Sequence, residues 1–148
     1  MGLFDIFKSK PNIQDTVFGE LKLTSGNNSF FSGRQIFAPL KKEVEIIIMT
    51  TENVVTPEQH KFYSELQTNY NEYKSKMTPI IEDTFKNAID NFSIVDFDKE
   101  FKLTTIMIPD FNEKPLVWNL SFETVHDLDH IFSVDFNDYE AIDVQIDG

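Results

Sequence analysis

The sequence predicts one α+β domain: a largely antiparallel sheet of about seven strands with helices packed on one face. Residues 16–50 and 99–147 alternate apolar and polar side chains as strands do, whereas residues 56–92 repeat apolar side chains every three or four positions, as helices do. The length of 148 residues fits one domain, which we place at residues 15–148, after an N-terminal segment of residues 1–14.

The N-terminal segment carries apolar residues at helical spacing. Leu3, Phe4 and Phe7 would share a helix face, and Pro11 would end that helix. We expect a helical turn packed on its own domain, and the alternative is a peptide that docks on a partner or a membrane surface.

Three strands are expected before the helices. They cover residues 17–23, 30–37 and 43–50, and a turn-forming Ser-Gly-Asn-Asn cluster separates the first two. In the third strand, Val44, Ile46 and Ile48 would share one face.

The clearest helix begins at Thr56. Thr56 can serve as its N-cap, Pro57 suits its first position and Gln59 can close a capping box. An apolar stripe follows at Phe62, Leu66, Tyr70, Tyr73 and Met77, which we interpret as core. Thr78-Pro79 repeats the start signal, so Pro79 either kinks one long helix or separates two helices.

Four further strands are expected in residues 99–147, where the alternation is cleanest. One face carries apolar residues, with Trp118 predicted to lie in the core. The connections between these strands are short and carry Asp, Asn or Pro, as hairpins do. An exposed edge strand of this sheet could pair two copies into a homodimer.

The charge of the chain is concentrated in its last third. The net charge is −12, and residues 96–148 hold 13 of the 25 acidic residues but only 3 of the 13 basic ones. Such a chain is a poor ligand for nucleic acid or for an anionic membrane surface. We therefore expect neither as a partner.

The outward side chains of the last three strands form the main candidate site. If these strands make a meander, several acidic side chains share one face without any base, and a turn adds two more. The candidate partner-binding residues are Glu123, Asp127, Asp129, Asp135, Asp143 and Asp147. They predict a surface for a basic protein partner, and the alternative is a merely solvated acidic face.

A second candidate involves two histidines. His126 and His130 lie four residues apart, which on a helix would suit zinc, but the stretch reads as a turn in which one of them would bond locally. The chain has no GxSxG, GxGxxG or P-loop motif and no cysteine, and its only arginine, Arg34, is expected in an ion pair. We expect a non-enzymatic protein without cofactor. The alternative is a small-molecule- or metal-dependent enzyme that uses the His126/His130 region.

Several stretches resemble small bacterial proteins of the polymorphic-toxin immunity type. They are FGELKL, TPEQHKFYSELQTNY, the pattern W-x-L-x-F-E, DLDHIFSVDF and the closing VQIDG. The resemblance implies tight stoichiometric binding without turnover, for which an acidic face would suit a basic nuclease. The lack of cysteine, of an apolar run of about 20 residues and of a secretory signal favours a cytoplasmic location.

Overall fold

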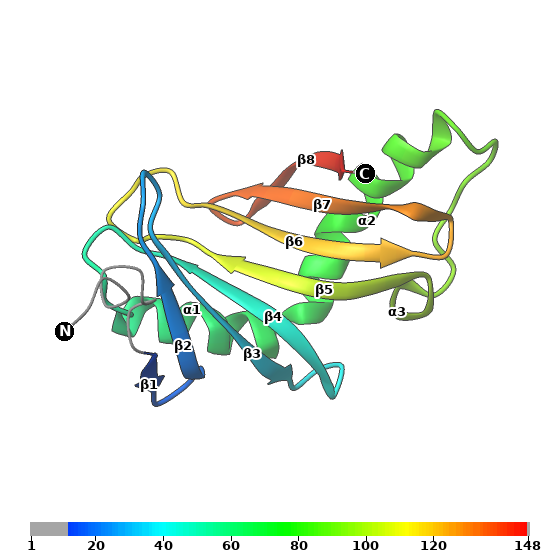
Figure 1. The fold of residues 1–148 in the computed structure, drawn as a ribbon. Helices are drawn as coiled ribbons and strands as arrows, with labels where there is room; N and C mark the ends of the chain where they lie inside the picture. The colour runs from blue at the N-terminus through cyan, green and yellow to red at the C-terminus, as the bar shows by residue number, and fades with distance from the viewer. Residues whose placement is uncertain (1–11, 148) are drawn as a thin grey trace.

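The computed structural model describes residues 12–147 and confirms the predicted α+β fold (Figure 1). The predicted helical turn at Leu3, Phe4 and Phe7 lies outside the described residues. Eight strands form one sheet, one more than the seven expected, because β1 precedes the first predicted strand. The strands are β1 (Ile13–Asp15), β2 (Gly19–Thr24), β3 (Phe30–Phe37), β4 (Lys42–Met49), β5 (Phe101–Ile108), β6 (Val117–Thr124), β7 (Asp127–Asn137) and β8 (Glu140–Asp147).

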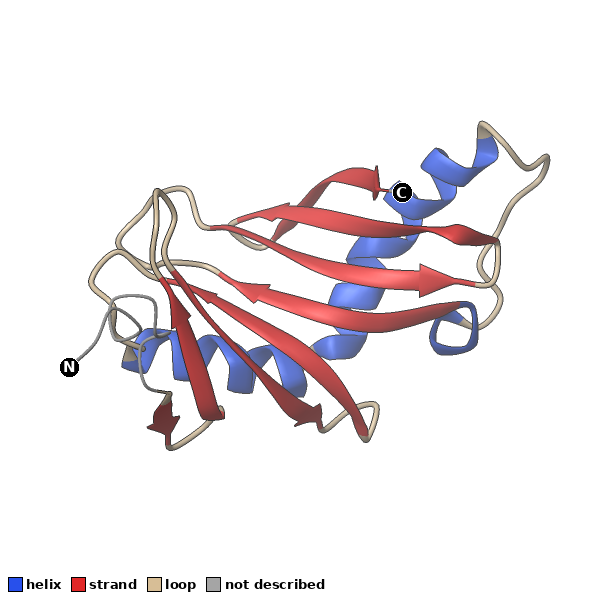
Figure 2. Ribbon diagram, in the orientation of Figure 1, coloured by secondary structure: helices blue, strands red, loops and turns tan. Residues whose placement is uncertain are grey.

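The strands lie side by side in the order of the sequence. Neighbours are antiparallel except β4 and β5, which run parallel. A parallel pair needs a crossover that returns the chain to the starting end of the sheet. The helices α1 (Pro57–Thr68), α2 (Tyr70–Lys86) and α3 (Phe97–Glu100) lie in this crossover. Two antiparallel meanders, β1–β4 and β5–β8, are thereby joined into one sheet, with α1 and α2 behind it (Figure 2).

The helical segment is broken at Asn69, not at Pro79. Pro79 lies inside α2, and Asn69 ends α1 with a φ of −107° and a ψ of 20°. Asparagine competes with helical hydrogen bonding through its own side chain, which makes it a natural break point. The break lets α1 lie behind the β1–β4 half and α2 behind the β5–β8 half (Figure 1).

The core lies between the helices and the sheet. Trp118 of β6 is fully buried, as predicted, and stacks on Phe136 with ring centroids 4.1 Å apart. Phe62 of α1 and Tyr73 of α2 meet the indole edge to face, at 4.8 and 5.4 Å. The indole N–H donates to the backbone carbonyl of Asp138 at 2.7 Å, so burial leaves no unpaired donor on this ring. Trp118 therefore joins both helices to β6 and β7.

Gln59 holds the carboxyl ends of the parallel pair together. Its side chain is 1% exposed, and its Nε2 donates to the carbonyls of Met49 at 2.7 Å and Pro109 at 3.0 Å. These carbonyls lie at the end of β4 and just beyond β5. The other end of the amide closes the predicted capping box, since Oε1 accepts from the Thr56 N–H and Thr56 Oγ1 accepts from the Gln59 N–H. One buried side chain thus fixes both the start of α1 and the spacing of β4 and β5.

Replacing Gln59 with leucine should destabilise the fold strongly. The change leaves two backbone carbonyls without their donor, at a cost of roughly 1–3 kcal/mol for each one that stays buried. Urea unfolding followed by circular dichroism would measure the loss. Gln67→Leu on the same helix is the matched control, because Gln67 accepts one hydrogen bond, from the Ala38 N–H, at an exposed site. Equal losses in the two variants would contradict the role assigned to Gln59.

Candidate functional site: the open face of the sheet

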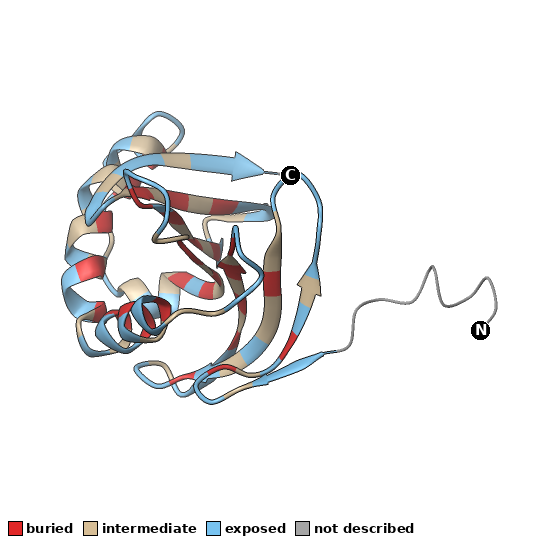
Figure 3. Cartoon of the chain, turned by 90° about the vertical axis from the view of Figure 1, so that its left-hand side faces the viewer, coloured by how far each residue is buried: buried red, intermediate tan, exposed pale blue. Residues whose placement is uncertain are grey.

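The sheet has one face that no helix or strand of residues 12–147 covers. Buried positions alternate with less buried ones along the strands (Figure 3). The buried side chains therefore share the face toward α1 and α2, and the alternate side chains share the opposite face. We call this second surface the open face. Its central row, read across β3 to β8, consists of Ser32, Ile47, Met107, Asn119, Asp135 and Asp143. Most of these side chains are only half-buried.

Four of the predicted residues lie together on the open face. Asp135 of β7 is the register partner of Asp143 of β8, and Ile131 is the partner of both Glu123 and Asp147. Glu123, Asp135, Asp143 and Asp147 therefore point to the same side, on three adjacent strands. We call these four residues the acidic strip.

No basic side chain of the same strands offsets the acidic strip. The segment from Val117 to Asp147 contains neither lysine nor arginine. Burial raises the pKa of Asp135 above its usual value, and the carboxylates of Asp143 and Asp147 raise it further, against a hydrogen bond from Gln145 that lowers it. Burial is the largest cause of this raised pKa, and like charge from the neighbouring strand adds to it.

The bases of the open face lie toward the other half of the sheet. Lys102 of β5 faces Glu123 across the strand pair and marks the border of the acidic strip. Farther away, Arg34 of β3 forms the predicted ion pair, with Glu43 of β4 at 2.5 Å. The face therefore changes from mixed charge on β3–β5 to purely acidic charge on β6–β8.

Asp127 and Asp129 lie apart from the acidic strip, at the hairpin between β6 and β7. The pairing of these strands shifts register between Glu123 and Thr124, which places Asp127 beside Thr124. His130 bonds the Asp127 carboxylate through Nδ1 at 2.8 Å, and this bond is the main cause that lowers the pKa of Asp127. Asp129 is exposed at the same end of the sheet. The structure thus divides the six predicted residues into a strip of four and a hairpin pair.

His126 and His130 contact different carboxylates. His126 Nε2 lies 2.8 Å from Glu100 Oε1, and its ring packs edge to face on Phe92 at 4.8 Å. Burial alone would raise the pKa of Glu100, but hydrogen bonds from backbone N–H groups and from His126 outweigh it and lower the pKa. Within residues 12–147 no group of three or more His, Cys, Asp or Glu side chains could hold a metal ion. His130 bonds locally to Asp127, as the sequence led us to expect of one histidine, whereas His126 contacts a carboxylate distant in the sequence.

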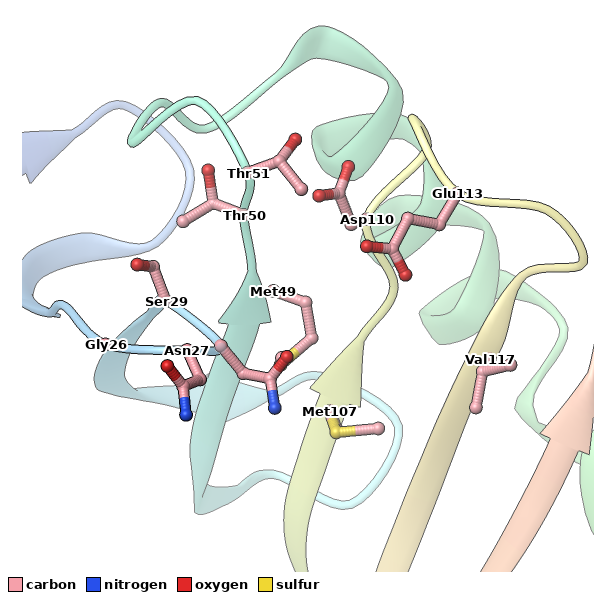
Figure 4. A pocket seen from close by; sticks show the side chains of 11 residues that line it. Gly26, Asn27, Ser29, Met49, Thr50, Thr51, Met107, Asp110, Glu113 and Val117 are labelled. Atoms are coloured by element: carbon pink, nitrogen blue, oxygen red, sulfur yellow. The ribbon is translucent and has the colours of Figure 1, made fainter.

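A pocket of about 390 Å³ opens at the carboxyl ends of β4 and β5 (Figure 4). Its walls come from the β2–β3 turn, from Thr50 and Thr51 after β4, and from Asp110 and Glu113 after β5. The sequence did not predict this pocket. Ligand-binding crevices in α/β sheets lie beyond the carboxyl ends of parallel strands. A prediction that β4 pairs with β5 in parallel would therefore have indicated a pocket here.

Comparisons with protein-family models, with curated proteins and with solved structures found no match. Among the helices of residues 12–147, none combines the length and the apolar character that crossing a membrane requires.

Replacing Asp135 with asparagine should stabilise the protein at neutral pH. A raised pKa means that the folded state binds the proton more tightly than the unfolded chain, so ionisation of Asp135 costs stability. The gain should therefore disappear as the pH falls below the ordinary aspartate value of 3.8. Urea unfolding at neutral pH and at a pH below 3.8 measures this gain in stability.

Glu100→Gln is the matched control, with the opposite sign. The pKa of Glu100 is lowered, so its ionised form stabilises the fold above the ordinary value of 4.5 and this contribution is lost in acid. If Asp135→Asn destabilised the protein at neutral pH, or if its gain in stability persisted in acid, the raised pKa of Asp135 would be contradicted.

Proposed function

We propose that this protein is a non-enzymatic, immunity-type binding protein that holds a basic protein partner against the acidic strip. One observation carries the proposal: three aspartates and a glutamate share the open face, which residues 12–147 leave uncovered, and β6–β8 contain no lysine or arginine to offset them. A partner that brings lysine or arginine side chains to this face would supply the missing counter-charges.

The arrangement carries an energetic cost that a partner would relieve. Like charges on directly opposite strand positions destabilise a sheet, and Asp135 and Asp143 are such a pair. Burial is the largest cause of the raised pKa of Asp135, and the carboxylates of Asp143 and Asp147 raise it further. A surface selected only for stability and solubility would intersperse both signs of charge.

Apolar side chains beside the acidic strip fit a protein interface. Val117 of β6 is 55% exposed and Ile131 of β7 is 46% exposed, both on the open face. Interfaces between proteins combine such apolar contacts with a polar rim. The uncovered face is also wide and spans several strands, as a macromolecular partner requires (Figure 1).

The same charges argue against a homodimer that pairs through the β8 edge. An antiparallel pairing of β8 with its own copy would bring together two strands that each carry Glu140, Asp143 and Asp147 and no base. Such a pairing places like charges side by side, whereas a basic partner does not. The metal-dependent alternative gains no support from His126 and His130, since each is bonded to a separate carboxylate.

The proposal predicts that charge reversal on the acidic strip weakens partner binding. Asp143→Lys with Asp147→Lys changes two exposed positions of β8 and should weaken binding about tenfold at low salt, since exposed charge pairs contribute roughly 0.5–1 kcal/mol each. A pull-down from lysate of the native host, followed by titration of the recovered basic protein, measures the change.

The control variant carries the same charge change on the helix layer. Glu72→Lys with Asp83→Lys alters two exposed residues of α2 and should leave binding within about twofold, since the helices face away from the acidic strip. The proposal would be abandoned if both variants bound equally well, or if binding by the wild-type protein did not weaken at high salt.

A further inference from the structure

The described residues that line the pocket at the carboxyl ends of β4 and β5 include two carboxylates and no base. Asp110 and Glu113 lie on one wall, Asn27 and Ser29 on the facing wall, and the methionines Met49 and Met107 between them (Figure 4). Its volume of about 390 Å³ falls in the range of ligand pockets. Among residues 12–147, no lysine, arginine or histidine is part of its lining.

The negative charge of Asp110 is not offset by the described chain. Its Oδ1 accepts the Asn112 N–H at 2.9 Å, whereas Oδ2 is shut off from solvent and has no hydrogen-bond partner among residues 12–147. Neither Asp110 nor Glu113 forms an ion pair in that part of the chain. The nearby Lys114 extends over the ring of Phe111 instead, with Nζ 5.7 Å from its centroid. A carboxylate oxygen without a donor is unfavourable, and a cation in the pocket beside Asp110 would offset the negative charge of its carboxylate.

The apolar part of the pocket specifies what the cation is attached to. Met49, Met107 and Val117 all belong to the open face and line the pocket beside the two carboxylates. Methionine side chains adapt to flexible apolar chains. A hydrated metal ion would gain nothing from this wall, whereas a cation on an aliphatic stem would use both parts. The planar guanidinium, with its five N–H donors, best matches carboxylates, amides and hydroxyls in one pocket.

We propose that this pocket binds an alkyl-guanidinium group. The group comes either from an arginine of the basic partner or from a free guanidino compound, and the first source rests on the proposed function. The pocket and the acidic strip open on the same face, because Met107 and Asp135 lie in one row of side chains. A partner on the acidic strip could therefore reach the pocket with a side chain.

Agmatine, a decarboxylated arginine, is the probe, and its neutral urea analogue is the matched control ligand. Titration into the ¹⁵N-labelled protein should shift the amide signals of residues 26–29, 50–51 and 110–113, and the urea analogue should not. Glu113→Gln should weaken agmatine binding about tenfold, since one charge-assisted contact is lost. Glu113 is exposed, so this variant keeps the test valid even if Asp110→Asn fails to fold.

The variant Asp143→Lys with Asp147→Lys should bind agmatine as the wild type does, which separates this proposal from the proposed function. If Glu113→Gln also weakens binding of the basic partner, the partner supplies the guanidinium. If it weakens only agmatine binding, the source is a free guanidino compound. The proposal is overturned if agmatine shifts no pocket signals, if the urea analogue shifts them equally, or if Glu113→Gln binds agmatine unchanged.

Discussion

The parallel pairing of β4 with β5 is the constraint on which the rest of the molecule depends. It requires the chain to return from one end of the sheet to the other before β5 begins, and the helices lie in this return. Gln59 fixes the spacing of the two strands, because its one amide group binds the backbone at the end of β4 and just beyond β5 and also caps α1. The crossover places both long helices on one face, and the opposite face stays uncovered in the described residues (Figure 2).

The uncovered face explains why acidic residues scattered through the sequence meet. Side chains on a strand alternate between faces, so the buried apolar residues of β6 and β7 place the intervening polar residues on the opposite face. Antiparallel register then aligns Asp135 with Asp143 and brings Asp147 beside them. In a fold with a second helix layer these carboxylates would be buried and would have to be neutralised. Here they are half-buried or exposed, which suits recognition of a basic surface.

The sequence contained most of the fold but only part of the sites. Alternation alone located β2–β8, and the Thr56-Pro57-x-Gln59 signal located the start of α1, because both depend on neighbouring residues. The break at Asn69 was not predicted. Asn69 and Pro79 both disfavour a helix, and which of them interrupts it depends on how α1 and α2 pack on the sheet. The alternation of side chains predicted the acidic strip. Asp127 lies apart from it, because the strand pairing shifts register at the hairpin and His130 bonds the Asp127 carboxylate. The pocket could not be predicted, because it depends on the pairing of two strands more than fifty residues apart in the sequence, which no local pattern encodes.

The central claim is that the open face recognises the partner while the helices support the sheet. It is tested most directly by mapping backbone amide signals of the ¹⁵N-labelled protein as the recovered basic partner is added. We expect the largest signal changes on β6–β8, at and around Asp135 and Asp143, while the signals of the exposed residues of α1 and α2 stay unchanged. Changes centred on α1 and α2, with β7 and β8 unaffected, would contradict it.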